Sequence, residues 1–293
     1  MLELVLPPHV TLPGAQSRII QAKDGEDYRI FIMVPDGEAP AGGFPVLYML
    51  DANAAFLTFA QTMAVLSIWR DGTGVEPMVI VGIGYPVEGA FDARRRAFDY
   101  TPAARPGGPP QHCADRLSCP MGGAARFLDF IQDQVKPEIE REFPVDRERQ
   151  SMFGHSFGGI FVLHALFTRP RSFGTYVAAS PSLAWGQPAI GMEEADFRAQ
   201  AGHGSVRLLV TAGEYEQKLA PHERDLPEAA RRLAYLEEFR MIDHARTMVD
   251  RLAALDRPGL HVELRIFDGE GHMSLVPSSA SHSLRFISGA SAS

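Results

Sequence analysis

The segment Gln150-Ser151-Met152-Phe153-Gly154-His155-Ser156-Phe157-Gly158-Gly159 decides the fold of this chain. Its first four residues predict a short buried strand, and apolar residues at helical spacing predict a helix over Gly158–Thr168. Ser156 lies at the turn between them, in the pattern Gly-x-Ser-x-Gly. Glycines two residues before and two residues after it remove Cβ atoms that would crowd a tight turn. The turn therefore exposes the Ser156 hydroxyl beside the N-terminus of the helix, whose dipole favours negative charge.

The rest of the chain alternates short apolar runs with longer helical patterns. This alternation is typical of a mostly parallel sheet with helices on both faces, and runs without polar alternation indicate strands buried on both sides. Strands are predicted over Pro45–Leu50, Met78–Gly84, Gln150–Phe153, Thr175–Ala179, Val206–Ala212 and Leu260–Phe267, after a hairpin of Ser17–Ala22 and Tyr28–Val34. Further helices are predicted over Ala54–Trp69, Ala124–Glu142, Glu228–Leu255 and Ser279–Ile287. Together with the turn at Ser156, this order predicts the α/β-hydrolase fold.

The length of 293 residues and the hydrophobic content of 45% fit one large α/β domain, so we expect a single domain over residues 1–293. Residues 85–123 are rich in proline, glycine and arginine, residues 186–204 have few apolar anchors, and both stretches are predicted as loop insertions near the exposed serine. Loops of this length in a compact domain are usually functional or disordered.

The charge and the cysteine content limit the partners of the chain. Its net charge of -8 gives nucleic acid no electrostatic reason to bind. The first ten residues lack the charged start and long apolar core that predict a signal peptide, and no apolar run has the length expected of a membrane span. We therefore expect a soluble protein of the cytoplasm, with the periplasm left open. Cys113 and Cys119 are expected to be free thiols, with a pair in one loop as the alternative. With His112 they match no familiar ligand spacing, so no metal or other cofactor is expected.

A serine hydroxyl needs a histidine base, which is oriented in turn by a carboxylate, and in this fold the chain order is serine, acid, histidine. His272 follows the last predicted strand on a glycine-rich loop, so it is the predicted base. The acid is expected in the loop after Val206–Ala212, where Glu216 is our choice and Glu214 the reserve. A pair of serine and histidine without an acid remains the third alternative.

Two backbone amides are needed to stabilise the oxyanion of the reaction. They are expected from Phe157, the residue after the nucleophile, and from Asn53, in the loop after the strand Pro45–Leu50. His155 is not expected to be the base, because the turn directs its side chain elsewhere. His164 lies on an apolar helix face, where a packed residue is the expected role.

Several further stretches resemble one family within this fold. They are Val46-Leu47-Tyr48-Met49-Leu50-Asp51, Arg95-Arg96 with Asp99-Tyr100-Thr101-Pro102, the glycine-rich turn at Ser156, Ser180-Pro181-Ser182-Leu183, Gly213-Glu214-Tyr215-Glu216 and Gly271-His272. Together they resemble the siderophore-esterase-like family, which includes enterobactin and salmochelin trilactone esterases and is related to S-formylglutathione hydrolase and feruloyl esterases. The resemblance implies a serine esterase that cleaves the ester bonds of a cyclic tri-serine catecholate siderophore, either free or iron-loaded.

An iron catecholate is strongly anionic, so a protein with this net charge needs a local basic patch to bind it. Arg95 and Arg96 lie in the first loop insertion, and their planar guanidinium groups suit both anions and aromatic rings. The alternative is that one of them pairs with Asp99 or another buried carboxylate and holds the loop. Trp185 is expected near the rim of the pocket, where it either stacks on a catechol or packs within the protein.

The predicted reaction is hydrolysis of a small-molecule carboxylic ester through an acyl-enzyme. The same residues would also serve S-formylglutathione, a feruloyl ester or a general short-chain ester. An acyltransferase, in which an alcohol replaces water, and a catalytically silent binding module are the alternatives from other classes.

Overall fold

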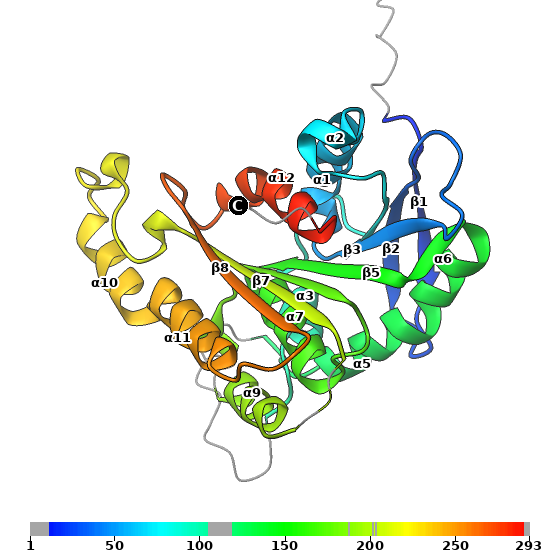
Figure 1. Cartoon of the computed structure of the whole chain (residues 1–293). Helices are drawn as coiled ribbons and strands as arrows, with labels where there is room; N and C mark the ends of the chain where they lie inside the picture. The colour runs from blue at the N-terminus through cyan, green and yellow to red at the C-terminus, as the bar shows by residue number, and fades with distance from the viewer. Residues whose placement is uncertain (1–11, 105–118, 187, 201, 203, 290–293) are drawn as a thin grey trace, which may run out of the picture.

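One sheet of eight strands organises the chain, in the order β1-β2-β4-β3-β5-β6-β7-β8 (Figure 1). The computed structural model describes residues 12–104, 119–186, 188–200, 202 and 204–289. β2 pairs antiparallel with both β1 and β4, and all the other neighbours are parallel. The strands are β1 (Ala15–Gln21), β2 (Asp27–Met33), β3 (Phe44–Met49), β4 (Val79–Gly84), β5 (Val145–His155), β6 (Thr175–Ala179), β7 (Val206–Gly213) and β8 (Leu260–Phe267).

Helices cover both faces of this sheet. In Figure 1, α1, α2 and α12 lie above the sheet, and α3, α5, α7, α9 and α11 lie below it. The helices are α1 (Ala52–Ser67), α2 (Arg70–Thr73), α3 (Ala93–Asp99), α5 (Ala124–Phe130), α6 (Lys136–Glu142), α7 (Phe157–Thr168), α8 (Leu183–Gly186), α9 (Ala189–Ala199), α10 (Ala229–Phe239), α11 (Met241–Ala253) and α12 (Leu275–Ile287). A π-helical turn joins α5 to α6. Among the described residues, no helix combines the length and the hydropathy that crossing a bilayer requires.

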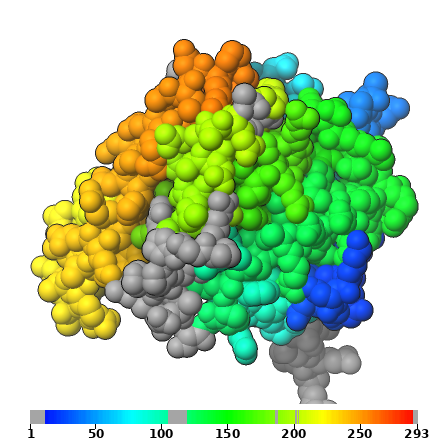
Figure 2. Space-filling model, turned by 90° about the horizontal axis from the view of Figure 1, so that it is seen from below, coloured from blue at the N-terminus to red at the C-terminus, as the bar shows by residue number. Residues whose placement is uncertain are grey.

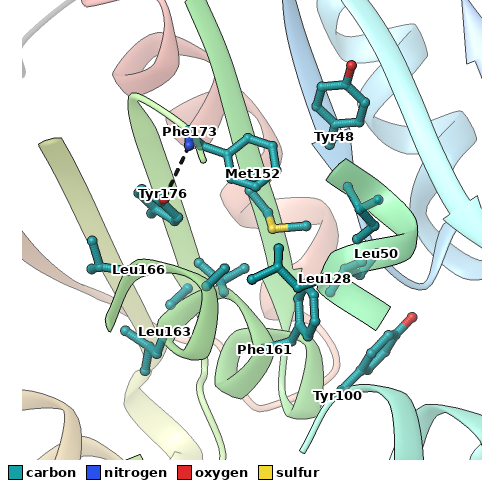
Figure 3. Packing of buried hydrophobic residues seen from close by; sticks show 14 of the residues in the cluster. Tyr48, Leu50, Tyr100, Leu128, Met152, Phe161, Leu163, Leu166, Phe173 and Tyr176 are labelled. Carbon is teal, nitrogen blue, oxygen red and sulfur yellow. Dashed lines mark hydrogen bonds between the residues drawn. The ribbon is translucent and has the colours of Figure 1, made fainter. Parts of the chain in front are cut away.

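The period of two along the strands divides the core into two halves. On β3, Val46 and Tyr48 point into the cluster beneath the sheet, and Leu47 and Met49 point into the cluster under α1 and α12. The larger cluster surrounds α7, which is apolar on every side and buried along most of its length. Figure 3 shows Phe161 of α7 packed in this cluster. The helix that follows Ser156 is therefore held rigidly by its surroundings.

All the predicted strands are present, and the predicted hairpin is β1–β2. β5 begins five residues before the predicted strand and continues to His155, next to the exposed serine. α1 begins at Ala52, two residues earlier than expected, and α12 begins at Leu275, four residues earlier. The carboxyl ends of β5, β7 and β8 therefore lie at the same edge of the sheet, because these strands run parallel.

The prediction that residues 186–204 form a loop is wrong, because α9 lies within them. Its inward face carries Glu193 and Glu194, which are both buried. Glu193 accepts hydrogen bonds from His164 on α7 at 2.9 Å, and Glu194 accepts from Arg251 on α11. Figure 2 shows the yellow-green surface of α9 next to the orange surface of α11, where this second pair joins them. Charged residues at core positions concealed the amphipathic pattern of the helix.

The single helix predicted over Glu228–Leu255 is also wrong, because two helices meet at Arg240. The φ angle of Arg240 is 44°, in the left-handed region, and its N–H donates to the carbonyl of Leu236. The apolar spacing continues across this residue, so periodicity alone did not show the break. The bend brings Phe239 and Met241, on either side of it, into the same cleft.

The stretch 85–123 contains more structure than a loop. Its first part forms α3, in which Asp92 caps the N-terminus by accepting a hydrogen bond from the N–H of Arg95 at 3.0 Å. Residues 105–118 lie outside the described residues. Cys119 is a free thiol, and the predicted state of Cys113 falls outside the described part of the chain.

Candidate active site

Ser156 occupies a strained turn between β5 and α7. Its φ of 62° and ψ of -115° are rare for a residue with a side chain. A Cβ atom on Gly154 would lie 2.2 Å from the carbonyl oxygen of Gly158, and one on Gly159 would lie 2.9 Å from the Cα of Pro181. A Cβ atom on Gly158 would meet only ordinary contacts, of 3.5 Å or more. The close approach that we expected at both flanking glycines therefore exists at Gly154, with Gly159 as the second crowded position.

The hydroxyl of Ser156 begins a chain of hydrogen bonds through three elements. Its Oγ lies 3.0 Å from Nε2 of His272, and Nδ1 of the same ring lies 2.8 Å from Oε2 of Glu216. Glu216 is 2% exposed and follows β7, and His272 lies in the loop after β8. The structure thus brings together the three side chains in the chain order serine, acid, histidine.

The directions of these hydrogen bonds follow from the acid. A carboxylate only accepts, so Nδ1 of His272 carries the proton and Nε2 is left to accept from Ser156. Ser182 Oγ lies 3.1 Å from Ser156 Oγ, and with the Ser156 proton given to His272 the Ser182 hydroxyl is the donor. On the other side, Oε1 of Glu216 accepts from the Ser180 hydroxyl at 2.5 Å and from the N–H of Gly213 at 2.7 Å. Every polar atom of this series therefore has a partner.

Glu214, the reserve acid, points away from His272. Its carboxylate accepts from the N–H of Gly269 at 2.7 Å and from Lys218 at 2.6 Å. The hydrogen bond from Lys218, followed by the one from Gly269, lowers the pKa of Glu214. Of the two carboxylates, only Glu216 contacts the histidine ring.

Phe157 and Asn53 stand where an oxyanion hole needs them along the chain. Phe157 is the first residue of α7 and Asn53 is the second residue of α1, so neither N–H has an acceptor within its own helix. The side chain of Asn53 is occupied, because Nδ2 donates to the carbonyl of Tyr85 at 3.0 Å and Oδ1 accepts from the N–H of Tyr85 at 2.8 Å. It ties α1 to the end of β4, which leaves the backbone N–H as the group of interest.

The two other histidines considered in the sequence lie in the protein interior. His155 is 6% exposed, and its Nε2 donates to the carbonyl of His272 at 2.8 Å. Burial, together with the neighbouring His272, lowers the pKa of His155 to about 3, so its ring is neutral at ordinary pH. Through this hydrogen bond, His155 therefore fixes the backbone of the loop that carries His272. His164 is a buried residue of α7, bonded to Glu193.

The two arginines expected to bind substrate instead hold α3 in place. Arg96 donates twice to Asp51, at 2.9 and 2.8 Å, and its side chain is 14% exposed. Arg95 donates to the carbonyl of Asp27 at 2.8 Å, pairs with Glu26 at 3.3 Å and lies over aromatic rings. Neither lines the cleft beside Ser156. These contacts favour the structural alternative for Arg95 and Arg96, with Glu26 and Asp51 as the carboxylates in place of Asp99.

An open cleft lies over Ser156, with about 670 Å³ of empty space that includes its solvent-exposed mouth. Trp185 lines it, half-buried, and stacks on Phe239 with ring centres 5.1 Å apart and planes 8° from parallel. Trp185 also meets Phe157 edge-on at 6.0 Å. Trp185 therefore packs within the protein and also forms a wall of the cleft, and its stacking on a catechol stays a prediction.

The sequence reasoning missed several residues that the cleft contains. Ser182 in the cleft and Ser180 buried behind Glu216 were noted only for a resemblance, although both bond directly to the series at Ser156. Arg232, Tyr235 and Phe239 were hidden within a predicted helix. Their spacing of three and four residues, on one side of α10, is the signal that a search for a shared helix face would have found.

The fold and the hydrogen-bonded order of Ser156, His272 and Glu216 are those of serine hydrolases of the α/β-hydrolase class. A family model described as "Putative esterase" matches residues 22–250 of the chain. The protein belongs to this esterase family, as the sequence predicts.

Relatives of known name are similar over nearly the whole chain. The ferri-bacillibactin esterase BesA of Bacillus subtilis (strain 168) is 37% identical over 279 residues, which cover 94% of this chain and 90% of that protein. The siderophore triacetylfusarinine C esterase of Aspergillus fumigatus is 37% identical over 294 residues, covering 95% of this chain and 94% of that protein. The solved structure of the siderophore hydrolase EstA from Aspergillus nidulans has a TM-score of 0.83 at 30% identity, and covers 98% of this chain and 100% of that chain.

Proposed function

We propose that this esterase hydrolyses the ester bonds of a siderophore, with Ser156 as the nucleophile. The observation that carries the proposal is the hydrogen bond of 3.0 Å between Ser156 Oγ and His272 Nε2 at the base of an aromatic cleft. This is the geometry that a serine needs to become a nucleophile at neutral pH. The names of the relatives supply the substrate class.

The reaction proceeds through an acyl-enzyme in two halves. His272 Nε2 takes the proton of Ser156 as Oγ attacks the ester carbonyl, and the ring then gives this proton to the leaving alcohol. Glu216 holds the ring in its reactive tautomer and stabilises its positive charge. The N–H groups of Phe157 and Asn53 receive the negative charge on the carbonyl oxygen. Water then attacks the acyl-enzyme by the same route, releases the acid and restores Ser156.

Two observations support a siderophore ester as the substrate, and the second of them favours a siderophore with aryl groups. Relatives at 37% identity act, by their names, on ferri-bacillibactin and on triacetylfusarinine C, and another is named an enterobactin esterase. Four of the residues that line the cleft beside Ser156 carry aromatic rings, among them Trp185 and Phe239. Aromatic rings stack favourably on other rings, so this wall suits the catechol arms of a cyclic tri-serine lactone.

Removal of the nucleophile tests the reaction. Ser156→Ala is expected to lower kcat for p-nitrophenyl acetate by about 10⁶ while the enzyme stays folded, because the other groups cannot form the acyl-enzyme. Ser17→Ala, on an exposed position of β1, is the matched control and is expected to retain full activity. A Ser156→Ala enzyme with more than a hundredth of the activity would overturn the assignment of the nucleophile.

Competing substrates test the proposed specificity. We expect kcat/KM for a cyclic catecholate trilactone, free or iron-loaded, to exceed that for p-nitrophenyl acetate, for S-formylglutathione and for a feruloyl ester. Product analysis with added alcohols separates hydrolysis from acyl transfer. A preference for the thioester would refute the siderophore while leaving Ser156 as the nucleophile.

A further inference from the structure

A continuous series of side chains runs from the nucleophile to the mouth of the cleft. Phe157 meets Trp185 edge-on, and Trp185 stacks on Phe239. Phe239 lies next to Tyr235, with ring centres 4.3 Å apart, and the guanidinium of Arg232 lies 5.6 Å from the centre of the Tyr235 ring. Four aromatic rings, of which the first belongs to Phe157 beside Ser156, therefore form a row that ends at the positive charge of Arg232.

Arg232 is the only arginine or lysine among the described residues that line this cleft. Its side chain is 37% exposed, and its Nε lies 3.4 Å from Glu223. Glu223 is itself held by the N–H of Ala220, at 2.9 Å. A guanidinium carries four further N–H donors on its two terminal nitrogens, so a pair through Nε leaves most of its hydrogen-bonding capacity for another anion.

The position of Arg232 follows from the helix that carries it. Residues at positions 232, 235, 236 and 239 of α10 share one face of the helix, and this face lines the cleft. Arg231, one position earlier, is exposed and lines a second hollow, which Arg232 and Tyr235 also line, but it does not line the cleft beside Ser156. Of these two adjacent arginines, only Arg232 therefore lines the cleft beside Ser156.

We propose that the α10 face, formed by Arg232, Tyr235 and Phe239 with Trp185 of α8, is a subsite for a negatively charged aryl group of the ester substrate. The inference deepens the proposed function and rests on Ser156 being the nucleophile. The aryl ring stacks on the aromatic wall, and Arg232 binds its carboxylate or phenolate oxygen. This places the basic group that an anionic substrate requires on α10, since Arg95 and Arg96 are already bound to carboxylates within the protein.

Two acetyl esters that differ only in charge test this subsite. 4-Acetoxybenzoate carries a carboxylate on the ring, and its methyl ester is neutral. For each enzyme we divide kcat/KM for the anionic ester by kcat/KM for the neutral ester. Comparing this ratio between a variant and the wild type cancels the intrinsic reactivity of the two esters. Arg232→Gln is expected to lower this ratio about tenfold, because a charge-assisted hydrogen bond is lost from a partly exposed site.

Arg231→Gln is the matched control, because Arg231 is the neighbour of Arg232 in the chain, carries the same charge and does not line the cleft. It is expected to keep the wild-type ratio. Raising the salt concentration from 0.02 to about 0.5 M is expected to lower the ratio of the wild type and of Arg231→Gln, but not that of Arg232→Gln. An unchanged ratio in Arg232→Gln, or an equal loss in both variants, would overturn the subsite.

Binding without turnover separates this inference from the proposed function. Calorimetry on Ser156→Ala is expected to show tighter binding of 4-acetoxybenzoate than of its methyl ester, and the added change Arg232→Gln is expected to remove the difference. If Arg232→Gln removes the preference for 4-acetoxybenzoate, the subsite is supported even when the wild type hydrolyses neither ester. In that case only the proposed function is refuted. Equal binding of the two esters by Ser156→Ala would refute the subsite and leave the ester hydrolysis intact.

Discussion

Replacing Glu216 by glutamine changes the state of the base without changing the shape of the site. Oε1 of Glu216 accepts from the Ser180 hydroxyl and from the N–H of Gly213, so the amide oxygen of the glutamine must take this place. The amide NH₂ then faces Nδ1 of His272, in the position of the carboxylate oxygen that lies 2.8 Å away. Nδ1 becomes an acceptor, and the ring proton moves to Nε2, which faces Ser156.

The size of the effect follows from this tautomer. A histidine with its proton on Nε2 cannot accept the proton of Ser156, and it also loses the negative charge that stabilises its protonated form. In serine hydrolases with the same geometry, such a change costs about 10⁴ in kcat. This corresponds to about 5 kcal/mol of activation free energy.

The assay is the steady-state hydrolysis of p-nitrophenyl acetate at pH 7.5, with the thermal midpoint as a measure of folding. Glu214→Gln is the matched control, because Glu214 lies two residues away, is bound to Lys218 and Gly269, and does not contact His272. Its kcat is expected to stay within about threefold of the wild type. A loss below tenfold in Glu216→Gln would refute the role of the acid and leave a pair of Ser156 and His272. Equal losses in both variants would refute the choice between the two carboxylates.

Two further predictions concern buried charges. Arg96→Met leaves Asp51 without its partner at a buried position, so the free energy of unfolding in urea is expected to fall by about 3–5 kcal/mol; a wild-type stability, with selective loss of activity on anionic esters, would restore Arg96 as a substrate-binding residue. The pKa of His155 is lowered from 6.5 to about 3 in the folded protein, so between these pH values the unfolded chain binds more protons and stability falls as the pH falls. His155→Gln is expected to remove up to about 1.4 kcal/mol per pH unit of this slope between pH 6.5 and 4.5, measured in urea. Identical slopes in the two proteins would contradict a buried neutral His155.

Local chemistry made the reacting residues predictable from the sequence. The turn at Ser156 requires small neighbours at fixed spacing, because the backbone of Gly158 lies 2.2 Å from the position of a Cβ atom on Gly154. The strands on either side are continuous apolar runs, so a mostly parallel sheet and the place of His272 after the last strand followed from the pattern alone.

Polar residues within the core were not predictable in this way. Glu193 and Glu194 belong to the buried face of α9, and they are tolerated there because His164 and Arg251 reach them from α7 and α11. Arg240 breaks a helix whose apolar spacing continues without interruption. The partners of the two glutamates come from other parts of the chain, and a propensity summed over neighbouring residues carries no information about them.

The sequence by itself indicated the fold, through the alternation of strands and helices, and it predicted Ser156 as the nucleophile and His272 as the base from short local stretches. Only the tertiary structure decided which carboxylate faces His272 and which arginine faces the cleft. Glu214 and Glu216 lie on a single turn, and the approach of Gly213 to the backbone of Glu270 orients this turn. The roles of the arginines depend on contacts across the fold, such as that of Arg96 with Asp51, because a charge is neutralised by whichever group packing brings near it.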